Sequence, residues 1–144
     1  MKKLKAGIYY RLSKNHRKNI SMQKRVCRKY CKENKIKIIN EYADENYSGR
    51  TLNRPSFKRM LKDKEINCIL IYKLDRFGRD SSKMFPLIDH LEKRGVKLIS
   101  ATQKFDTSTP EGKFTMKLMV LLAEFESNLI SARTIDGLRY RRKK

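Results

Sequence analysis

Short apolar runs alternate with helical patterns along roughly the first hundred residues of this chain. The runs cover residues 4–10, 36–42, 68–72 and 96–101. Strands that alternate with helices favour an α/β fold, in which helices cover the faces of a mainly parallel sheet. We therefore expect one α/β domain with a sheet of about four to five strands, and helices that begin at Pro55 and near Asp80.

The last third of the chain differs from the rest. From Pro110 to about Arg142 it has no internal proline, which predicts one helix of about 30 residues and ~45 Å. Such a helix projects beyond a core formed by residues 1–109. Its apolar side chains recur at steps of three and four residues: Phe114, Leu118, Leu121, Leu122, Phe125, Leu129, Ala132 and Ile135. We expect residues 110–144 to bury this stripe against a second subunit, with a helix folded back on its own core as the alternative.

The charge of the chain indicates a nucleic-acid partner. Lys and Arg number 36 against 15 acidic residues, a formal net charge of +21. The last six residues hold five positive charges, so the remainder still carries +16. A field of this strength attracts nucleic acid with an affinity that falls as salt rises. A lysine-rich solvated surface is the alternative explanation.

The three cysteines, with no signal peptide or apolar membrane-spanning run in the sequence, fit a protein of the reducing cytoplasm. Cys27 and Cys31 could share one helix face and form half of a metal site, but no complementary pair accompanies them, so we expect buried thiols. The sequence has no Walker loop and no convincing cluster of metal ligands. We therefore expect no cofactor and no metal.

Arginines stand where two of the strand runs end. Arg11 closes the first run, two residues before Ser13, and Arg76 and Arg79 come directly after the third run. Guanidinium groups are planar, permanently charged forks that match the equatorial oxygens of a phosphodiester during transfer. The two histidines stand in no nucleophile-elbow context. Phosphoryl transfer with a serine nucleophile is therefore the favoured chemistry.

Several short motifs occur in a definite order along nearly the whole chain. They are residues 9–13 (YYRLS), 20–23 (ISMQ), 44–49 (DENYSG), 53–55 (NRP), 72–79 (YKLDRFGR) and the long-helix residues 124–126 (EFE) and 132–134 (ART). In this order they resemble the catalytic domain of the serine site-specific recombinases, the resolvase/invertase family. Residues 53–55 and 106–110 look closest to its large-integrase branch. The resemblance implies the family's resolvase-like α/β fold.

The resemblance also implies a mechanism. Ser13 matches the nucleophile that attacks the scissile phosphate, which leaves a 5′-phosphoserine link and a free 3′-hydroxyl without nucleotide or metal. Arg11, Arg76 and Arg79 match the arginines that bind this phosphate. Asp75 matches a carboxylate that orients arginines or assists proton transfer to the leaving oxygen, and the sequence leaves both roles open.

Further positions match supporting residues of the family. Those expected to hydrogen-bond around the arginines and the serine are Gln23, Asp44, Ser48 and Arg54. Arg133 matches an arginine near the active site, with a DNA-backbone contact as the alternative, whereas Tyr9 and Lys73 are expected to be structural or to contact phosphate. At the end of the long helix, the residues expected to bind DNA are Arg139, Arg141 and Arg142.

The resemblance implies double-stranded DNA as substrate, and a homodimer that forms a synaptic tetramer in a bacterial or phage setting. Because the sequence contains no unit that reads a recombination site, we expect a catalytic-domain fragment, with a naturally short protein as the alternative. Two other functions stay open. One is a non-catalytic nucleic-acid-binding or assembly module, and the other is a metal-dependent nuclease that uses Asp44, Asp75 and Asp80.

Overall fold

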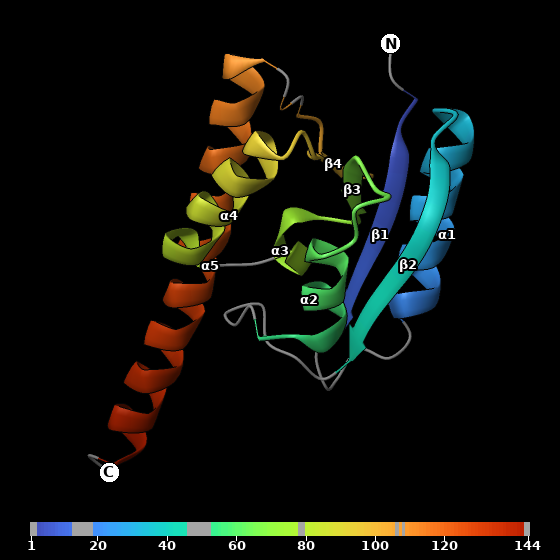
Figure 1. Ribbon diagram of the computed structural model, residues 1–144. Helices are drawn as coiled ribbons and strands as arrows, with labels where there is room; N and C mark the ends of the chain where they lie inside the picture. Colours follow the sequence, from blue (N-terminus) through green and yellow to red (C-terminus); the bar gives the residue numbers. More distant parts are fainter. Residues whose placement is uncertain are drawn as a thin grey trace.

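The computed structural model describes residues 3–12, 19–45, 53–77, 80–105, 107 and 109–142. For residues 19, 75, 127, 131 and 134–142 it describes the backbone alone. Strands and helices alternate along these ranges (Figure 1) in the order β1 (Lys5–Leu12), α1 (Asn19–Glu33), β2 (Lys37–Glu45), α2 (Pro55–Leu61), β3 (Cys68–Ile71), α3 (Leu74–Phe77), α4 (Ser81–Lys93), β4 (Lys97–Ser100) and α5 (Pro110–Arg142).

The four strands form one parallel sheet in the order β2-β1-β3-β4. This confirms the expected α/β class and the four strand runs. The chain moves from β1 to one edge of the sheet, and from β3 to the other edge, so the strand order reverses between β1 and β3. In open sheets of this kind, ligands bind outside the carboxyl ends of the strands at the point of reversal.

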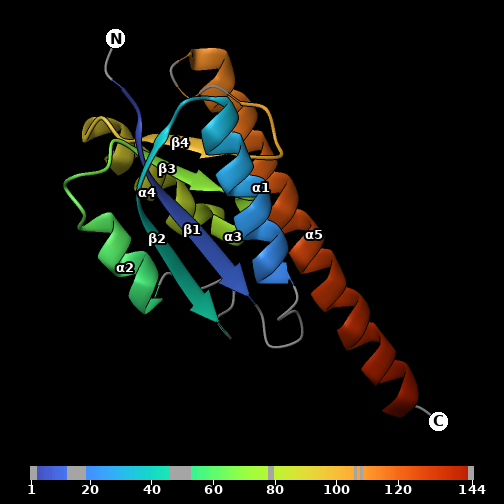
Figure 2. The same cartoon turned by 90° about the vertical axis from the view of Figure 1, so that its right-hand side faces the viewer.

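Helices cover both faces of the sheet because alternate side chains of the strands point to opposite sides. Ile8 and Tyr10 of β1 pack with the buried Cys27 and Cys31 of α1, whereas Tyr9 packs with the helices of the other face. Figure 1 shows α1 on one side of the sheet and α2, α4 and α5 on the other, and in the turned view of Figure 2 α1 lies in front of the sheet. Burial raises the pKa of Cys27 to about 12 and that of Cys31 to about 11, so both are buried thiols, as expected.

Helix α5 has 33 residues, and its C-terminal half projects away from the sheet (Figure 1). Of its described side chains, only Met116 and Val120 are buried. Six residues of the predicted stripe stay exposed, together with Ile130: Phe114, Leu118, Leu121, Leu122, Phe125 and Leu129. The helix thus contacts its own core in its first half, as far as Glu124. Among the described residues, no helix is both long and apolar enough to cross a membrane.

Helices α1 and α4 end with the same arrangement, in which one residue with positive φ reverses the chain. This residue is Lys35 (φ 55°) after α1 and Gly95 (φ 74°) after α4. In both cases the next N–H donates back to the last helical turn, as in a Schellman motif: Ile36 N to Cys31 O (2.8 Å) and Val96 N to Leu91 O (2.9 Å). A lysine therefore occupies a position that favours glycine.

We predict that Lys35→Gly increases the free energy of unfolding by about 0.5–1 kcal/mol, because it removes the strain of a side chain in the left-handed region. Urea denaturation measures this change. The matched control is Gly95→Ala, which places a side chain in the same conformation and should lower the free energy by about 1 kcal/mol. Equal effects of both substitutions would contradict the account of these helix ends.

Candidate active site

Two arginine-bearing segments meet at the carboxyl ends of β1 and β3. Arg11, near the end of β1, is only 2% exposed, and its Nε donates a hydrogen bond to the backbone oxygen of Arg76 in α3 (3.3 Å). The two residues are 65 positions apart in the sequence. Parallel strands end at the same edge of a sheet, so both segments reach the point where the strand order reverses.

Arg54 lies at the centre of this region and is 0% exposed. It precedes Pro55, the first residue of α2. One of its amino groups, Nη1, donates to the hydroxyl of Tyr9 (3.0 Å) and to the backbone oxygen of Arg76 (3.3 Å), while Nη2 donates to the backbone oxygen of Phe77 (2.5 Å). The guanidinium carbon also lies 4.4 Å from the ring centre of Phe57. Arg54 thus binds the backbone of α3.

Asp44 supplies the negative charge for this buried cation. The hydroxyl of Tyr9 donates to Asp44 Oδ2 (2.9 Å) and accepts from Arg54, so it links the two charged groups. The carboxylate also accepts from the N–H groups of Ser56 and Phe57, both at 3.0 Å. These N–H groups lie in the first turn of α2 and have no acceptor within the helix, and an anion is favoured at a helix N-terminus. Asp44 on β2 therefore caps α2.

Burial shifts the pKa values of Arg54 and Tyr9 in opposite directions. It lowers the pKa of Arg54, but an arginine side chain stays charged in proteins. It raises the pKa of Tyr9. The Tyr9 hydroxyl therefore stays protonated and donates a hydrogen bond to Asp44. A buried ion without its partner is strongly unfavourable. Arg54, Tyr9 and Asp44 consequently depend on one another.

Gln23 of α1 supports the end of β1 from the other side of the sheet. Its side chain is buried, and Nε2 donates to the backbone oxygen of Arg11 (3.4 Å). Within the described part of the chain, Gln23 Oε1 has no hydrogen-bond partner. Four of the predicted residues therefore come together with Arg76 around one point: Arg11, Gln23, Asp44 and Arg54.

The described contacts do not include the other predicted residues. Ser13, Ser48 and Arg79 lie outside the described residues, as does the side chain of Asp75. Arg133 is exposed on α5, well beyond Val120, and is not part of the buried cluster. The backbones of Arg139, Arg141 and Arg142 lie in the last turns of α5, and their side chains are outside the description.

Tyr9 contributes more to the cluster than its sequence position indicated. It borders a motif, and we expected it to be structural or to contact phosphate. The alternation of side chains along β1 was the available signal, because it places Tyr9 and Arg11 on one face of the strand. The sequence could not indicate that the Tyr9 hydroxyl bonds to side chains 35 and 45 positions away.

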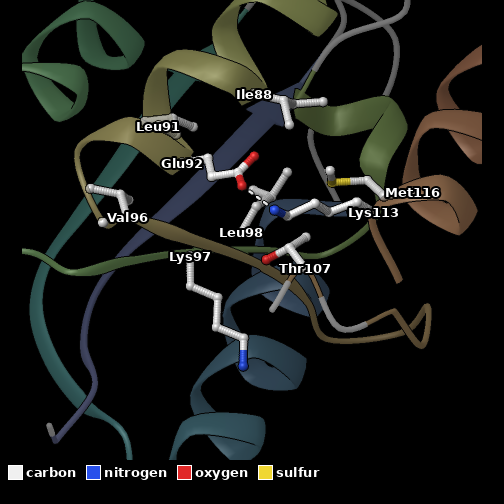
Figure 3. A pocket seen from close by; sticks show the side chains of 10 residues that line it. Ile88, Leu91, Glu92, Val96, Lys97, Leu98, Thr107, Lys113 and Met116 are labelled. Carbon is white, nitrogen blue, oxygen red and sulfur yellow. Dashed lines mark hydrogen bonds and ion pairs between the residues drawn. The ribbon is translucent and has the colours of Figure 1, made fainter. Parts of the chain in front are cut away.

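An apolar cavity of about 250 Å³ lies away from this cluster (Figure 3). Leu91, Leu98 and Met116 are among its lining residues, and Lys113 of α5 forms an ion pair with Glu92 of α4 beside it. Lys97, the first residue of β4, also lines it. The cavity is therefore near the amino ends of the strands, whereas the arginines gather at the carboxyl ends.

The fold and the arginine cluster define a class of protein, an α/β domain with a cationic site at the carboxyl edge of its sheet. The family description "Resolvase, N terminal domain" matches residues 6–144. The chain is 38% identical over 102 residues to the serine recombinase gin of Escherichia phage Mu, covering 70% of this chain and 53% of that protein. It is 40% identical over 96 residues to the DNA-invertase hin of Salmonella typhimurium, covering 66% and 50%.

Two solved structures are similar in fold and sequence. The N-terminal catalytic domain of TP901-1 integrase is 30% identical with a TM-score of 0.71, covering 87% of this chain and 98% of that one. A resolvase family site-specific recombinase from Streptococcus pneumoniae is 25% identical with a TM-score of 0.68, covering 99% and 100%. The chain belongs to the serine recombinase family, of which it contains the resolvase-type N-terminal catalytic domain. It spans about half the length of the relatives gin and hin.

We predict that Tyr9→Phe lowers the free energy of unfolding by about 1–3 kcal/mol, because it removes one bond from each of two buried charged groups. Urea denaturation measures the loss. Tyr10→Phe is the matched control, since the Tyr10 hydroxyl donates to Glu41, which keeps both hydrogen bonds from Arg28. This control should lose less stability, and a larger loss for Tyr10→Phe would contradict the linking role of Tyr9.

Proposed function

We propose that this chain cleaves and rejoins DNA by phosphoryl transfer to Ser13. The observation that carries the proposal is the meeting of Arg11 and Arg76 at the carboxyl edge of the sheet. Ser13 directly follows Leu12, the last residue of β1, in the sequence. Membership in the serine recombinase family supports the same chemistry.

The reaction exchanges one phosphodiester bond for another. The Oγ of Ser13 attacks the phosphorus, a bond from Oγ to phosphorus forms, and the bond from phosphorus to the 3′-oxygen breaks. The serine gives up its proton, and the leaving 3′-oxygen takes up a proton. The 5′ strand end stays on the protein as a phosphoserine ester. Attack by a 3′-hydroxyl reverses the step and reseals the strand without an external energy source.

Two groups of arginines divide the work in this proposal. Arg11, Arg76 and Arg79 stabilise the charge that spreads over the phosphate oxygens, and preorganised donors of this kind are effective because they need no reorganisation. Arg54 instead holds the α3 backbone in place, since both of its amino groups donate to acceptors within the protein. Asp75 orients the arginines or assists the proton transfer.

The assembly completes the proposed function. Residues 1–109 form the catalytic core, and residues 110–144 form the helix for dimer contacts and DNA. The exposed apolar side chains of α5 support a homodimer, which pairs into a synaptic tetramer on double-stranded DNA. Arg133, Arg139, Arg141 and Arg142 contact the DNA backbone. The relatives from phages and bacteria support the bacterial cytoplasm as the place of action.

A metal-dependent nuclease receives less support from the contacts. Asp44 accepts three hydrogen bonds within the protein, and Asp80 accepts from Ser82 as the N-cap of α4. Both carboxylates therefore already have structural partners. A non-catalytic assembly module would give the arginines at the sheet edge no function. The experiment below also tests this alternative.

We predict that the protein forms a covalent adduct with a pre-nicked DNA duplex in the presence of EDTA. A denaturing gel at high protein concentration detects the adduct. Ser13→Ala should abolish it, because the ester needs the serine oxygen. Arg76→Ala should slow it by about 10²–10³-fold, the usual cost of removing one preorganised donor.

Each alternative gives a different result in this assay. A metal-dependent nuclease would cut DNA only without the chelator and form no adduct. A non-catalytic module would bind DNA equally well with and without Ser13 and form no adduct. If the protein binds DNA without reacting, the assay is repeated with a heterologous DNA-binding domain fused after Lys144. Failure of this fusion would contradict the proposed function.

We predict that the protein self-associates through α5 at micromolar concentrations. Phe125→Asp should yield a monomer, because Phe125 is 63% exposed within the apolar stripe and a charge there cannot be buried at an interface. Sedimentation equilibrium measures the change. Ile38→Asp is the matched control, since Ile38 is an exposed apolar residue on β2. A wild-type protein that stays monomeric at high concentration would contradict the dimer.

A further inference from the structure

The turn that follows β4 contacts the chain where β3 leads into α3. Both segments leave the carboxyl edge of the sheet, because β3 and β4 are neighbouring parallel strands. The backbone N–H of Ala101 donates to the oxygen of Ile71 (2.8 Å), which continues the pairing of the two strands beyond Ser100. The turn after β4 therefore lies beside the start of α3, the helix that carries Arg76.

Two hydroxyl groups of this turn bind the chain just before α3. Ser100 is 5% exposed, and its Oγ donates to the backbone oxygen of Tyr72 (3.0 Å). The hydroxyl of Thr102 donates to the same oxygen (2.6 Å). Ser100 Oγ also accepts from the N–H groups of Thr102 (3.3 Å) and Gln103 (3.1 Å). These bonds fix the turn and place Gln103 beside α3.

Gln103 caps α3. Its Oε1 accepts from the backbone N–H of Leu74, the first residue of the helix (2.9 Å). An N–H in the first turn of a helix has no acceptor within that helix, so an oxygen from another segment satisfies it. Helix α3 has only four residues, and a helix this short depends on contacts with other elements for its stability.

Helix α3 is thus held at both ends by side chains from other elements. Gln103 binds the N–H of its first residue, whereas Arg11 and Arg54 bind backbone oxygens near its last residue. Arg76 stands two residues after Leu74 on the same helix. A change at the start of α3 therefore moves Arg76 as well.

We propose that Gln103 is a positioning residue of the active site, which fixes the start of α3 and thereby the place of Arg76. This inference rests on the proposed function, in which Arg76 binds the phosphate, and adds a residue to it. Gln103 stands outside the motifs that mark the family, and it is 29 positions away from Leu74 in the sequence. No local pattern therefore indicates this role.

The test compares Gln103→Ala with Gln103→Glu. The rate of adduct formation at saturating DNA, the affinity for DNA and the thermal midpoint are measured for each variant. Gln103→Ala should react at least about tenfold more slowly with little change in affinity, since a misplacement near 1 Å can cost far more than that. Gln103→Glu should restore most of the rate, because a carboxylate can accept from the N–H of Leu74 and an anion is favoured at a helix N-terminus.

Asn67→Ala is the matched control. The side-chain oxygen of Asn67 also accepts from a backbone N–H, that of Lys5 (2.6 Å), but this contact lies at the amino ends of β1 and β3. The control should lower the thermal midpoint and react at close to the wild-type rate. If Asn67→Ala slows adduct formation as much as Gln103→Ala, the loss follows from stability alone and the inference is wrong.

A second readout separates this inference from the proposed function. With arginine labelled in nitrogen-15, the guanidinium signal of Arg76 in the DNA-free protein should shift in Gln103→Ala and stay in place in Gln103→Glu and Asn67→Ala. If wild type forms no adduct while this signal shifts as expected, the proposed chemistry fails and the positioning role stands. If the Arg76 signal is unchanged in Gln103→Ala, or if Gln103→Glu reacts as slowly as Gln103→Ala, the inference is overturned.

Discussion

The buried guanidinium of Arg54 is the constraint on which this structure depends. A charge that is 0% exposed must find its acceptors inside the protein, and the protein supplies a tyrosine hydroxyl and two backbone oxygens. The tyrosine comes from β1, the backbone oxygens come from α3, and Asp44 on β2 provides the opposite charge through Tyr9. One side chain thus fixes three elements around the start of α2.

In this arrangement, the arginine that holds the protein backbone differs from the arginines proposed to bind the phosphate. Both amino groups of Arg54 donate to acceptors within the protein, so we assign it to holding the backbone and not to binding the phosphate. Its bonds to the oxygens of Arg76 and Phe77 set the path of the α3 backbone, and Arg11 bonds to the same oxygen of Arg76. These bonds hold the backbone at the site in place before any DNA binds, which is the preorganisation that the proposed chemistry uses.

Much of this could be predicted from the sequence because it depends on local patterns. The four apolar runs became the four strands, Pro55 begins α2, and the run without proline became α5. Helix α3 was not predicted, since four residues show no periodicity. Periodicity also marks several apolar positions on α5 without saying that Met116 and Val120 face the core while Phe125 stays exposed. Bonds such as Tyr9 to Asp44 and Ser81 to Glu124 join distant positions and have no local signal.

The most direct measurement follows the arginine side chains by NMR as nicked duplex DNA is added. With arginine labelled in nitrogen-15 and signals assigned by single substitutions, the account predicts that Arg54 gives slowly exchanging guanidinium protons that stay unchanged, while the signals of Arg11 and Arg76 shift. Protection follows from its burial and its three acceptors. If the Arg54 signals shift on DNA addition as much as those of Arg76, then Arg54 binds the phosphate itself and the account is wrong.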